Sequence, residues 1–236
     1  GVGIGDVAQD RGVDVIVMAV VVPQLQAQCR ALEGVVLTQG FIASNSRRET
    51  VILGRGGSDT SGAYFAAKLQ AAGIDVSAVS RMPGDSTRSI VLVDPGGERT
   101  IVNLHRCREN GPPQRLASLE ADAVYVRSRD LDVTALLAEA AARSLVVAHV
   151  PPLEAGSRPA HVLVGSESDL PPEFLADPWA AGREIAGLAL RLVVVTRGER
   201  GAEAIGANEH ESVSAPHVTV VDSTAAGDVF AAGLVH

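Results

Sequence analysis

The sequence predicts an α/β protein built on a mostly parallel sheet with helices on both faces. Short valine-rich runs alternate along the chain with stretches rich in alanine and leucine, which is typical of strands that alternate with helices. The composition, with 46% hydrophobic and 20% charged residues, is that of a folded protein. The 236 residues are enough for one large domain or two small ones with a buried core.

In the first half of the chain, the pattern predicts two buried strands, one helix and one hairpin. The strands are the apolar runs 15–22 and 34–40, and the helix is 60–72, where apolar residues recur at roughly helical spacing. Residues 89–104 differ, because β-branched residues flank a turn cluster of Asp, Pro and two Gly at 94–97. This arrangement predicts a β-hairpin.

In the second half, strands and helices alternate more regularly. The predicted elements, in chain order, are strand 123–126, helix 133–143, strand 145–150, strand 161–164, helix 178–189, strand 192–196, a β segment near 213–221 and a helix that opens at Ala225. Ligands of such folds bind at the carboxyl ends of the strands. The candidate functional residues are therefore sought where strands end.

Charge and cysteine content exclude several classes of protein. The formal net charge of −8 argues against a general nucleic-acid-binding surface. The two cysteines, Cys29 and Cys107, form no CxxC pair, so neither a disulfide framework nor a structural zinc site is expected. The most apolar run, 15–22, is far shorter than the roughly 20 residues that cross a bilayer, and no signal-peptide pattern surrounds it. We therefore expect a cytoplasmic protein without a membrane partner.

The segment 221–228, VDSTAAGD, has the strongest chemical signal. A predicted strand runs into a turn of small residues that opens a helix, so that backbone N–H groups and the helix dipole can bind a phosphate. Asp228 lies inside this anion-attracting turn, which is reasonable if it accepts a proton from a hydroxyl that attacks phosphorus. The alternative is an ordinary aspartate of the first helical turn, stabilised by the dipole.

The stretch 222–228 resembles the DTxGAGD signature of the ribokinase-like (phosphofructokinase B type) carbohydrate kinases. The resemblance implies a three-layer αβα, Rossmann-like fold with a small β lid, and it implies that Asp228 is the general base. It assigns the anion hole and a nucleotide contact to Ala225, Ala226, Gly227 and Thr224.

A second segment, TRGERG at 196–201, resembles the TxGxxG nucleotide loop of the same family. Glycines in such a loop let the backbone approach a phosphate or ribose without a Cβ in the way. Taken alone, the pattern also describes a tight turn. The resemblance implies that Thr196, Gly198 and Gly201 line a nucleotide site.

A third segment, 164–169, stands where the family has its NxxE motif, which helps to hold magnesium and phosphate. Ser166 replaces the Asn and Asp169 replaces the Glu, so that oxygen ligands for a hard cation are still present. We expect Glu167 and Asp169 to serve the metal. The alternative is a solvated acidic start of a helix.

The resemblance also implies a substrate site under a lid. The hairpin at about 86–105 resembles the strand pair that covers the sugar, and such a lid would exclude water from the reaction. In this family the lid often pairs with a second copy, which predicts a homodimer. The implied substrate contacts are Asp10, Gly56, Gly57, Ser61 and Thr87, with Ser61 in the place of the Asn of GGxxxNxA.

Residues 34–44 and 51–60 resemble another family, aspartate kinase. There the LGRGGSD loop serves the aspartate and nucleotide sites, which would implicate Arg55, Ser58 and Asp59. The sequence has no KFGGTS motif, and its only lysine, Lys68, lies in the body of the following predicted helix. Complete aspartate kinase chemistry is therefore not expected.

Together these features predict one ribokinase-like domain over 1–236, truncated or hybrid, without the family's C-terminal helices. The predicted function is an ATP- and Mg²⁺-dependent transfer of phosphate to a hydroxyl of a small sugar or nucleoside. Two alternatives stay open: a non-catalytic ligand-binding relic, and an amino-acid kinase of the aspartate kinase type.

Overall fold

The computed structural model describes residues 14–18, 49–71, 73–86, 88–93, 99–105, 113–218 and 226–235. The chain divides into two compact units. Unit 1 comprises residues 1–111, 220–234 and 236, and unit 2 comprises residues 112–219 and 235. The strand predicted at 34–40 lies outside the described residues.

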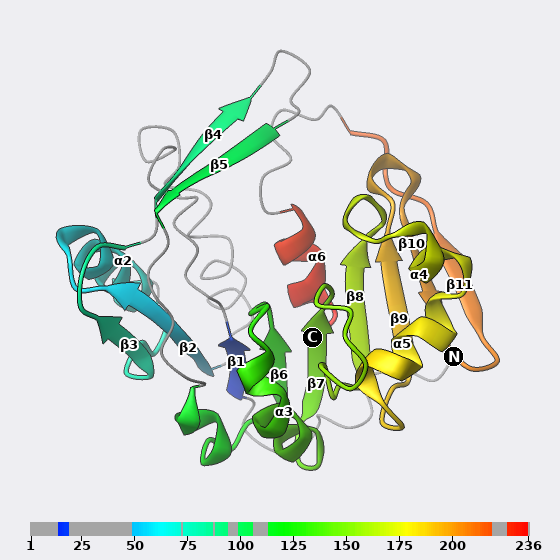
Figure 1. Ribbon diagram of the computed structural model, residues 1–236, viewed down its shortest axis with the longest axis horizontal. Helices are drawn as coiled ribbons and strands as arrows, with labels where there is room; N and C mark the ends of the chain where they lie inside the picture. Colours follow the sequence, from blue (N-terminus) through cyan, green and yellow to red (C-terminus); the bar gives the residue numbers. More distant parts are fainter. Residues whose placement is uncertain are drawn as a thin grey trace. The chain divides into compact units, whose positions relative to one another are not determined.

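Six strands make up the described sheet of unit 2, in the order β11-β10-β9-β8-β7-β6. The arrows of four of them point the same way in Figure 1 and pair in parallel: β6 (Ala123–Val126), β7 (Leu145–His149), β8 (Val162–Ser166) and β9 (Leu192–Thr196). Two antiparallel strands continue the sheet beyond β9, namely β10 (Ala202–Ile205) and β11 (His210–Val213). The predicted mostly parallel α/β sheet is thus confirmed.

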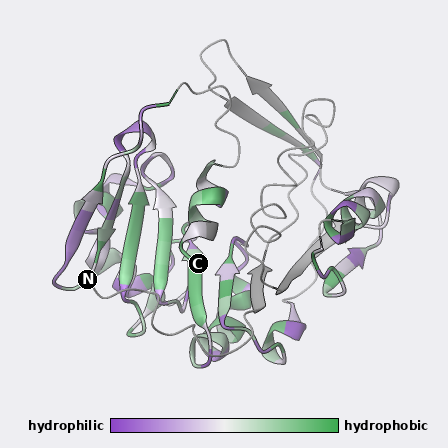
Figure 2. Ribbon diagram, turned by 180° about the vertical axis from the view of Figure 1, so that it is seen from behind, coloured by the Kyte–Doolittle hydropathy of each residue, from purple (hydrophilic) through white to green (hydrophobic). Residues whose placement is uncertain are grey.

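The parallel strands form the core of unit 2. Val124, Val146, Leu163 and Val193 are almost completely buried, and Figure 2 shows the central strands in the colour of hydrophobic residues. Strands covered on both faces need continuous apolar runs rather than alternation. This requirement is why the sequence pattern located these four strands closely.

Helices follow the strands of unit 2. They are α3 (Thr134–Ala141), α4 (Pro172–Ala176) and α5 (Pro178–Ala186), together with the short 3-10 helices η2 (Gln114–Ala117), η3 (Leu131–Val133), η4 (Glu167–Asp169) and η5 (Gly198–Arg200). Helix α3 packs against β7, and α5 packs against β9. The start of α5 is fixed by Asp177, whose carboxylate accepts a hydrogen bond from the Ala180 N–H at 3.0 Å.

Unit 1 contains a second parallel group of strands and the hairpin. Its described elements are β1 (Asp14–Met18), β2 (Glu49–Gly57), α2 (Thr60–Ala71), β3 (Val79–Met82), β4 (Arg88–Val93), β5 (Arg99–His105) and α6 (Ala226–Gly233). Strand β2 pairs in parallel with β1 and with β3, and β4 pairs antiparallel with β5. The predicted hairpin is therefore confirmed.

Several strands escaped the sequence pattern. The sequence did not identify β2, β3, β10 or β11, and it placed a β segment near 213–221, whereas β11 is His210–Val213 and residues 214–218 form no strand. All four residues of β11 are exposed. An exposed edge strand needs no apolar run, so hydrophobicity alone does not reveal it.

In the part of the chain that the structure describes, no helix combines the length and the hydropathy that a bilayer crossing requires.

Arg158 is a completely buried arginine in unit 2. Its Nη2 donates to the carbonyl oxygen of Ser128 at 2.6 Å, and its Nη1 donates to those of Asp130 at 3.0 Å and Ser157 at 3.3 Å. Burial lowers the pKa of Arg158 to about 10, although the charges of Asp130 and Glu154 act in the opposite direction. The side chain therefore fixes the chain segment that follows β6.

His149, the last residue of β7, is a second buried basic side chain. Burial and the nearby positive charges of Arg127 and Arg129 lower the pKa of His149 to about 3. The imidazole is neutral at physiological pH as a result.

We predict that Arg158→Ala lowers the free energy of unfolding by about 3 kcal/mol, because it leaves buried carbonyl groups without their donor. Urea denaturation measures the difference. Arg191→Ala, at an exposed arginine, is the matched control and should change stability by less than about 0.5 kcal/mol. Equal effects of the two substitutions would contradict the assigned role of Arg158.

We also predict that His149 makes the fold sensitive to acid. Between pH 6.5 and about 3, the unfolded chain protonates this imidazole and the folded chain does not, so the free energy of unfolding falls as the pH falls. From pH 7.5 to pH 5, the wild-type protein should lose about 2 kcal/mol more stability than His149→Gln. Urea denaturation at both pH values tests this, with the exposed His217→Gln as a control that behaves like the wild type. Parallel losses in wild type and His149→Gln would refute it.

Candidate functional site

The carboxyl ends of β8 and β9 bring two of the predicted motifs together within unit 2. The two strands are parallel neighbours, with Ser166 directly opposite Thr196. Strand β8 leads into η4, and β9 leads through Arg197 into η5. The NxxE-like segment and the TRGERG loop (residues 196–201) therefore begin side by side at the edge where α/β folds bind ligands.

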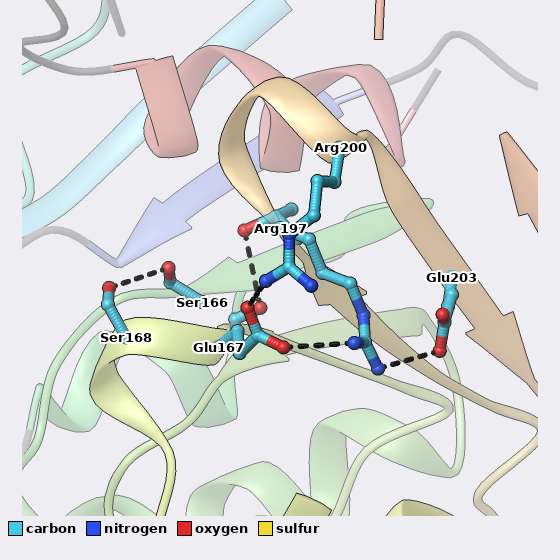
Figure 3. A network of polar contacts seen from close by, with 8 residues as sticks. Ser166, Glu167, Ser168, Arg197, Arg200 and Glu203 are labelled. Atoms are coloured by element: carbon cyan, nitrogen blue, oxygen red, sulfur yellow. Dashed lines mark hydrogen bonds and ion pairs between the residues drawn. The ribbon is translucent and has the colours of Figure 1, made fainter. Parts of the chain in front are cut away.

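Glu167 connects these two segments through its side chain. Its carboxylate accepts a hydrogen bond from Nη1 of Arg197 at 2.9 Å, and it also pairs with Arg200. Arg197 extends the chain of contacts, because its Nη2 binds the carboxylate of Glu203 on β10 at 2.9 Å. Figure 3 shows Glu167 between the two arginines and Arg197 between the two glutamates.

The backbone of the TRGERG loop closes on itself. The N–H of Arg197 donates to the carbonyl of Gly201 at 2.7 Å, and the N–H of Gly201 donates to the carbonyl of Gly198 at 3.0 Å. Gly198 has φ +56°, and a Cβ there would meet no atom within 4 Å in the part of the chain that the structure describes. At Gly201, with φ +97°, a Cβ would lie 1.9 Å from the carbonyl oxygen of Val213. Gly198 thus leaves space beside the loop, whereas Gly201 is required by close packing on the end of β11.

The remaining polar groups of these segments make short-range contacts. The Thr196 hydroxyl donates to the carbonyl of Gly165 at 3.4 Å, and the hydroxyls of Ser166 and Ser168 lie 2.9 Å apart. Asp169 is exposed on η4. These contacts hold the ends of β8 and β9 to each other and to η4.

The predicted metal ligands fit a cation unequally. Glu167 already neutralises two guanidinium groups, and these positive groups would repel a metal ion. The carboxylate of Asp169 remains a suitable oxygen ligand. Among the described residues, no group of three or more His, Cys, Asp or Glu side chains could hold a metal ion.

In unit 1, the predicted substrate loop is a tightly packed turn between β2 and α2. A Cβ on Gly57 would lie 2.2 Å from the backbone nitrogen of Ser86, so only glycine fits. The Asp59 carboxylate accepts hydrogen bonds from the N–H of Gly62 at 3.0 Å, from the N–H of Ser86 at 3.1 Å and from its hydroxyl at 2.6 Å. Asp59 therefore caps α2 and holds the segment that precedes β4.

The other residues of this turn have the following positions. The Ser58 hydroxyl accepts a hydrogen bond from the N–H of Gly84 at 3.2 Å, so Ser58 and Asp59, which the likeness to aspartate kinase implicates in binding, both contact the 84–86 segment. Gly56 ends β2 together with Gly57, and Ser61 is the second residue of α2. Asp10 and Thr87 lie outside the described residues.

The segment that the sequence predicts to be catalytic is described in part. Helix α6 begins at Ala226, and half-buried Asp228 lies in its first turn. No atom of the described residues lies within 4 Å of the position that a Cβ on Gly227 would take, so these residues leave the backbone at Gly227 open on that side. Thr224 and Ala225 are outside the described residues.

Sequence reasoning missed the charged partners around Glu167. Arg197, Arg200 and Glu203 are spaced closely within and after the TRGERG loop. That alternation of charge was the available signal, but Glu167 is distant in sequence, and only the pairing of β8 with β9 brings it within reach.

Solved structures of other proteins superpose on most of this chain. An adenosine kinase from Sinorhizobium meliloti is 18% identical, with a TM-score of 0.68 over 95% of this chain and 87% of that chain. Ribokinase from Thermotoga maritima is 16% identical, with a TM-score of 0.67 over 93% of this chain and 83% of that one. These similarities establish the ribokinase-like fold.

Sequence comparison gives two further matches. The lysine-sensitive aspartokinase 3 of Escherichia coli is 48% identical over 52 residues, which are 22% of this chain and 12% of that enzyme. This partial match agrees with the short stretch that resembles aspartate kinase. Residues 34–236 match the family described as pfkB family carbohydrate kinase. The chain therefore belongs to the pfkB family of carbohydrate kinases.

Proposed function

We propose that this chain transfers the γ-phosphoryl group of ATP to a hydroxyl group of a sugar or nucleoside. The observation that carries the proposal is the junction of the TRGERG loop with the NxxE-like segment at the carboxyl ends of β8 and β9. Membership of the carbohydrate kinase family supports the same reaction class.

In the proposed reaction, Asp228 acts as the general base. Its carboxylate accepts the proton of the substrate hydroxyl while that oxygen forms a bond to the γ-phosphorus, and the bond to the β,γ-bridging oxygen breaks to release ADP. The N–H groups of Ala225, Ala226 and Gly227 would donate hydrogen bonds to the phosphoryl oxygens as negative charge shifts. The open backbone at Gly227 is consistent with this role.

The nucleotide would bind along the TRGERG loop, with contacts from Thr196 and Gly198. The space beside Gly198 supports this proposal, whereas the packing of Gly201 against Val213 assigns that glycine to the shape of the loop. A bound Mg²⁺ would neutralise charge on the phosphate oxygens, and Asp169 is the residue of the predicted pair that fits it better.

The substrate would bind in unit 1, near the turn at Gly57 and beneath the β4–β5 hairpin. The names of the similar structures, ribokinase and adenosine kinase, suggest sugars and nucleosides as acceptors. A panel of both classes, assayed for ATP-dependent phosphorylation, would identify the acceptor. Because ATP is the proposed donor, we place the reaction in the cytoplasm.

Pairing of the hairpin with a second copy is part of the proposal. Ile90 lies opposite Val102 in the register of β4 with β5, and Leu104 follows two residues later. Their side chains are 42%, 45% and 61% exposed. An apolar surface of this kind favours contact with another protein surface, and sedimentation velocity would show whether the partner is a second copy.

The two alternatives predict different measurements. A ligand-binding relic would bind no nucleotide, and calorimetry with ATP and Mg²⁺ at millimolar concentration would then show no heat. An aspartate kinase would form aspartyl phosphate, which hydroxylamine traps. The likeness to aspartokinase covers 12% of that enzyme, so we place this alternative second.

We predict that Asp228→Asn lowers kcat by about a hundredfold or more, because the general base is lost. The dissociation constant of ATP, measured by calorimetry, should change less than about twofold, because the amide keeps the shape of the carboxylate. Asp132→Asn, at an exposed aspartate of η3, is the matched control and should retain full kcat. Undiminished turnover in Asp228→Asn would eliminate the proposed mechanism.

A further inference from the structure

A continuous network of charged side chains surrounds the TRGERG loop. Figure 3 shows four of its members: Glu167 of η4, Arg197 after β9, Arg200 of η5 and Glu203 of β10. His210 of β11 is the fifth member. The Glu203 carboxylate lies 3.5 Å from Nε2 of His210. The two arginines and the two glutamates balance in charge.

The central part of this network is shielded from solvent. The side chains of Glu167, Arg197 and Glu203 are 28%, 25% and 22% exposed, whereas that of Arg200 is 61% exposed. Partly buried ion pairs are screened less by salt than exposed ones. The fork of Arg197 binds one carboxylate with each Nη, which fixes its plane as well as its position. The Glu167–Arg197 contact is therefore better suited than a typical surface ion pair to keep η4 and the TRGERG loop in a fixed arrangement.

Within the described residues, the carboxylate of Glu167 links η4 to the TRGERG loop through Arg197 and Arg200. The loop's own backbone bonds, from Arg197 to Gly201 and from Gly201 to Gly198, determine its internal shape only. Gly198, with open space on one side, gives the backbone little support of its own. Glu167 therefore restrains the direction in which the loop N–H groups face, together with the Arg197–Glu203 pair and the packing of Gly201 on Val213.

We propose that Glu167 is a positioning residue that holds the TRGERG loop in the conformation that binds the nucleotide. This inference rests on the proposed function, and it replaces the expectation that Glu167 binds the metal. A metal ion on Glu167 would have to displace Arg197 and Arg200, both positively charged. The carboxylate acts instead by orienting the loop and by keeping the two guanidinium groups paired.

Calorimetry of ADP binding, in the presence of EDTA, separates loop positioning from metal binding. Glu167→Gln should weaken ADP binding about fivefold, which corresponds to the loss of two partly exposed ion pairs. Glu173→Gln, at an exposed glutamate in the first turn of α4, is the matched control and should bind ADP like the wild type. Glu167→Asp retains the charge on a shorter side chain. Its affinity for ADP should lie between those of Glu167→Gln and the wild type. Thermal unfolding verifies that each variant is folded.

Steady-state kinetics provide a readout that general loosening of the fold would not reproduce. In Glu167→Gln, the KM for ATP should rise about fivefold, while kcat and the KM for the acceptor stay within about twofold of the wild type. A loss of kcat with an unchanged KM for ATP would overturn the inference, because that result indicates a contact with the reacting atoms.

Three other outcomes overturn the inference, and they differ from failure of the proposed function. Unchanged ADP binding by Glu167→Gln, with a raised Mg²⁺ requirement, would make Glu167 a metal ligand. Tighter ADP binding by Glu167→Gln would mean that the Glu167 carboxylate competes with the phosphates of the nucleotide for Arg197 and Arg200. If Glu167→Gln and the wild type have the same affinity for ADP and the same kinetic constants, the network has no role in nucleotide binding. If the wild type itself binds no nucleotide, the proposed function fails, and this inference fails with it.

Discussion

The parallel pairing of β8 with β9 is the constraint on which the proposed site depends. It sets Ser166 opposite Thr196, so that the segments after both strands start at one edge of the sheet. Buried side chains such as Leu163 and Val193 hold the two strands in this register. Ion pairs between exposed loops are weak, but here the sheet has already brought the chain segments together. The entropic cost of forming the Glu167–Arg197 pair is correspondingly small.

The charge arrangement and the glycines of the TRGERG loop complement each other. Arg197 binds a carboxylate on each side, from Glu167 and from Glu203, and this holds the base of the loop. Gly201 permits close packing against the backbone of Val213, whereas Gly198 leaves its flank open. One glycine therefore serves the fold and the other is available to a ligand. The sequence motif does not distinguish Gly198 from Gly201, but their surroundings differ in the structure.

The sequence predicted β6 to β9 well, because strands buried on both faces require continuous apolar runs. It missed β11, whose residues are all exposed, since nothing in an exposed edge strand must be apolar. The TRGERG loop was visible as a motif, but the pairing of Glu167 with Arg197 was not, because it follows from strand order rather than from local sequence. Likewise, Asp59 stands before a helix, as capping residues do, yet its bonds to Ser86 depend on the pairing of β3 with β2, which is not visible in the local sequence. The roles of Asp228 and of the substrate contacts remain predictions.

We propose that the ends of β8 and β9 form one nucleotide-binding edge, which Glu167 helps to orient. Backbone amide shifts in NMR spectra of the whole protein, recorded while ADP is added, test this claim most directly. We expect the largest changes to occur together in residues 166–169 and 196–201, with the same dependence on ADP concentration. Changes confined to other parts of the sheet, or changes in only one of the two segments, would contradict it.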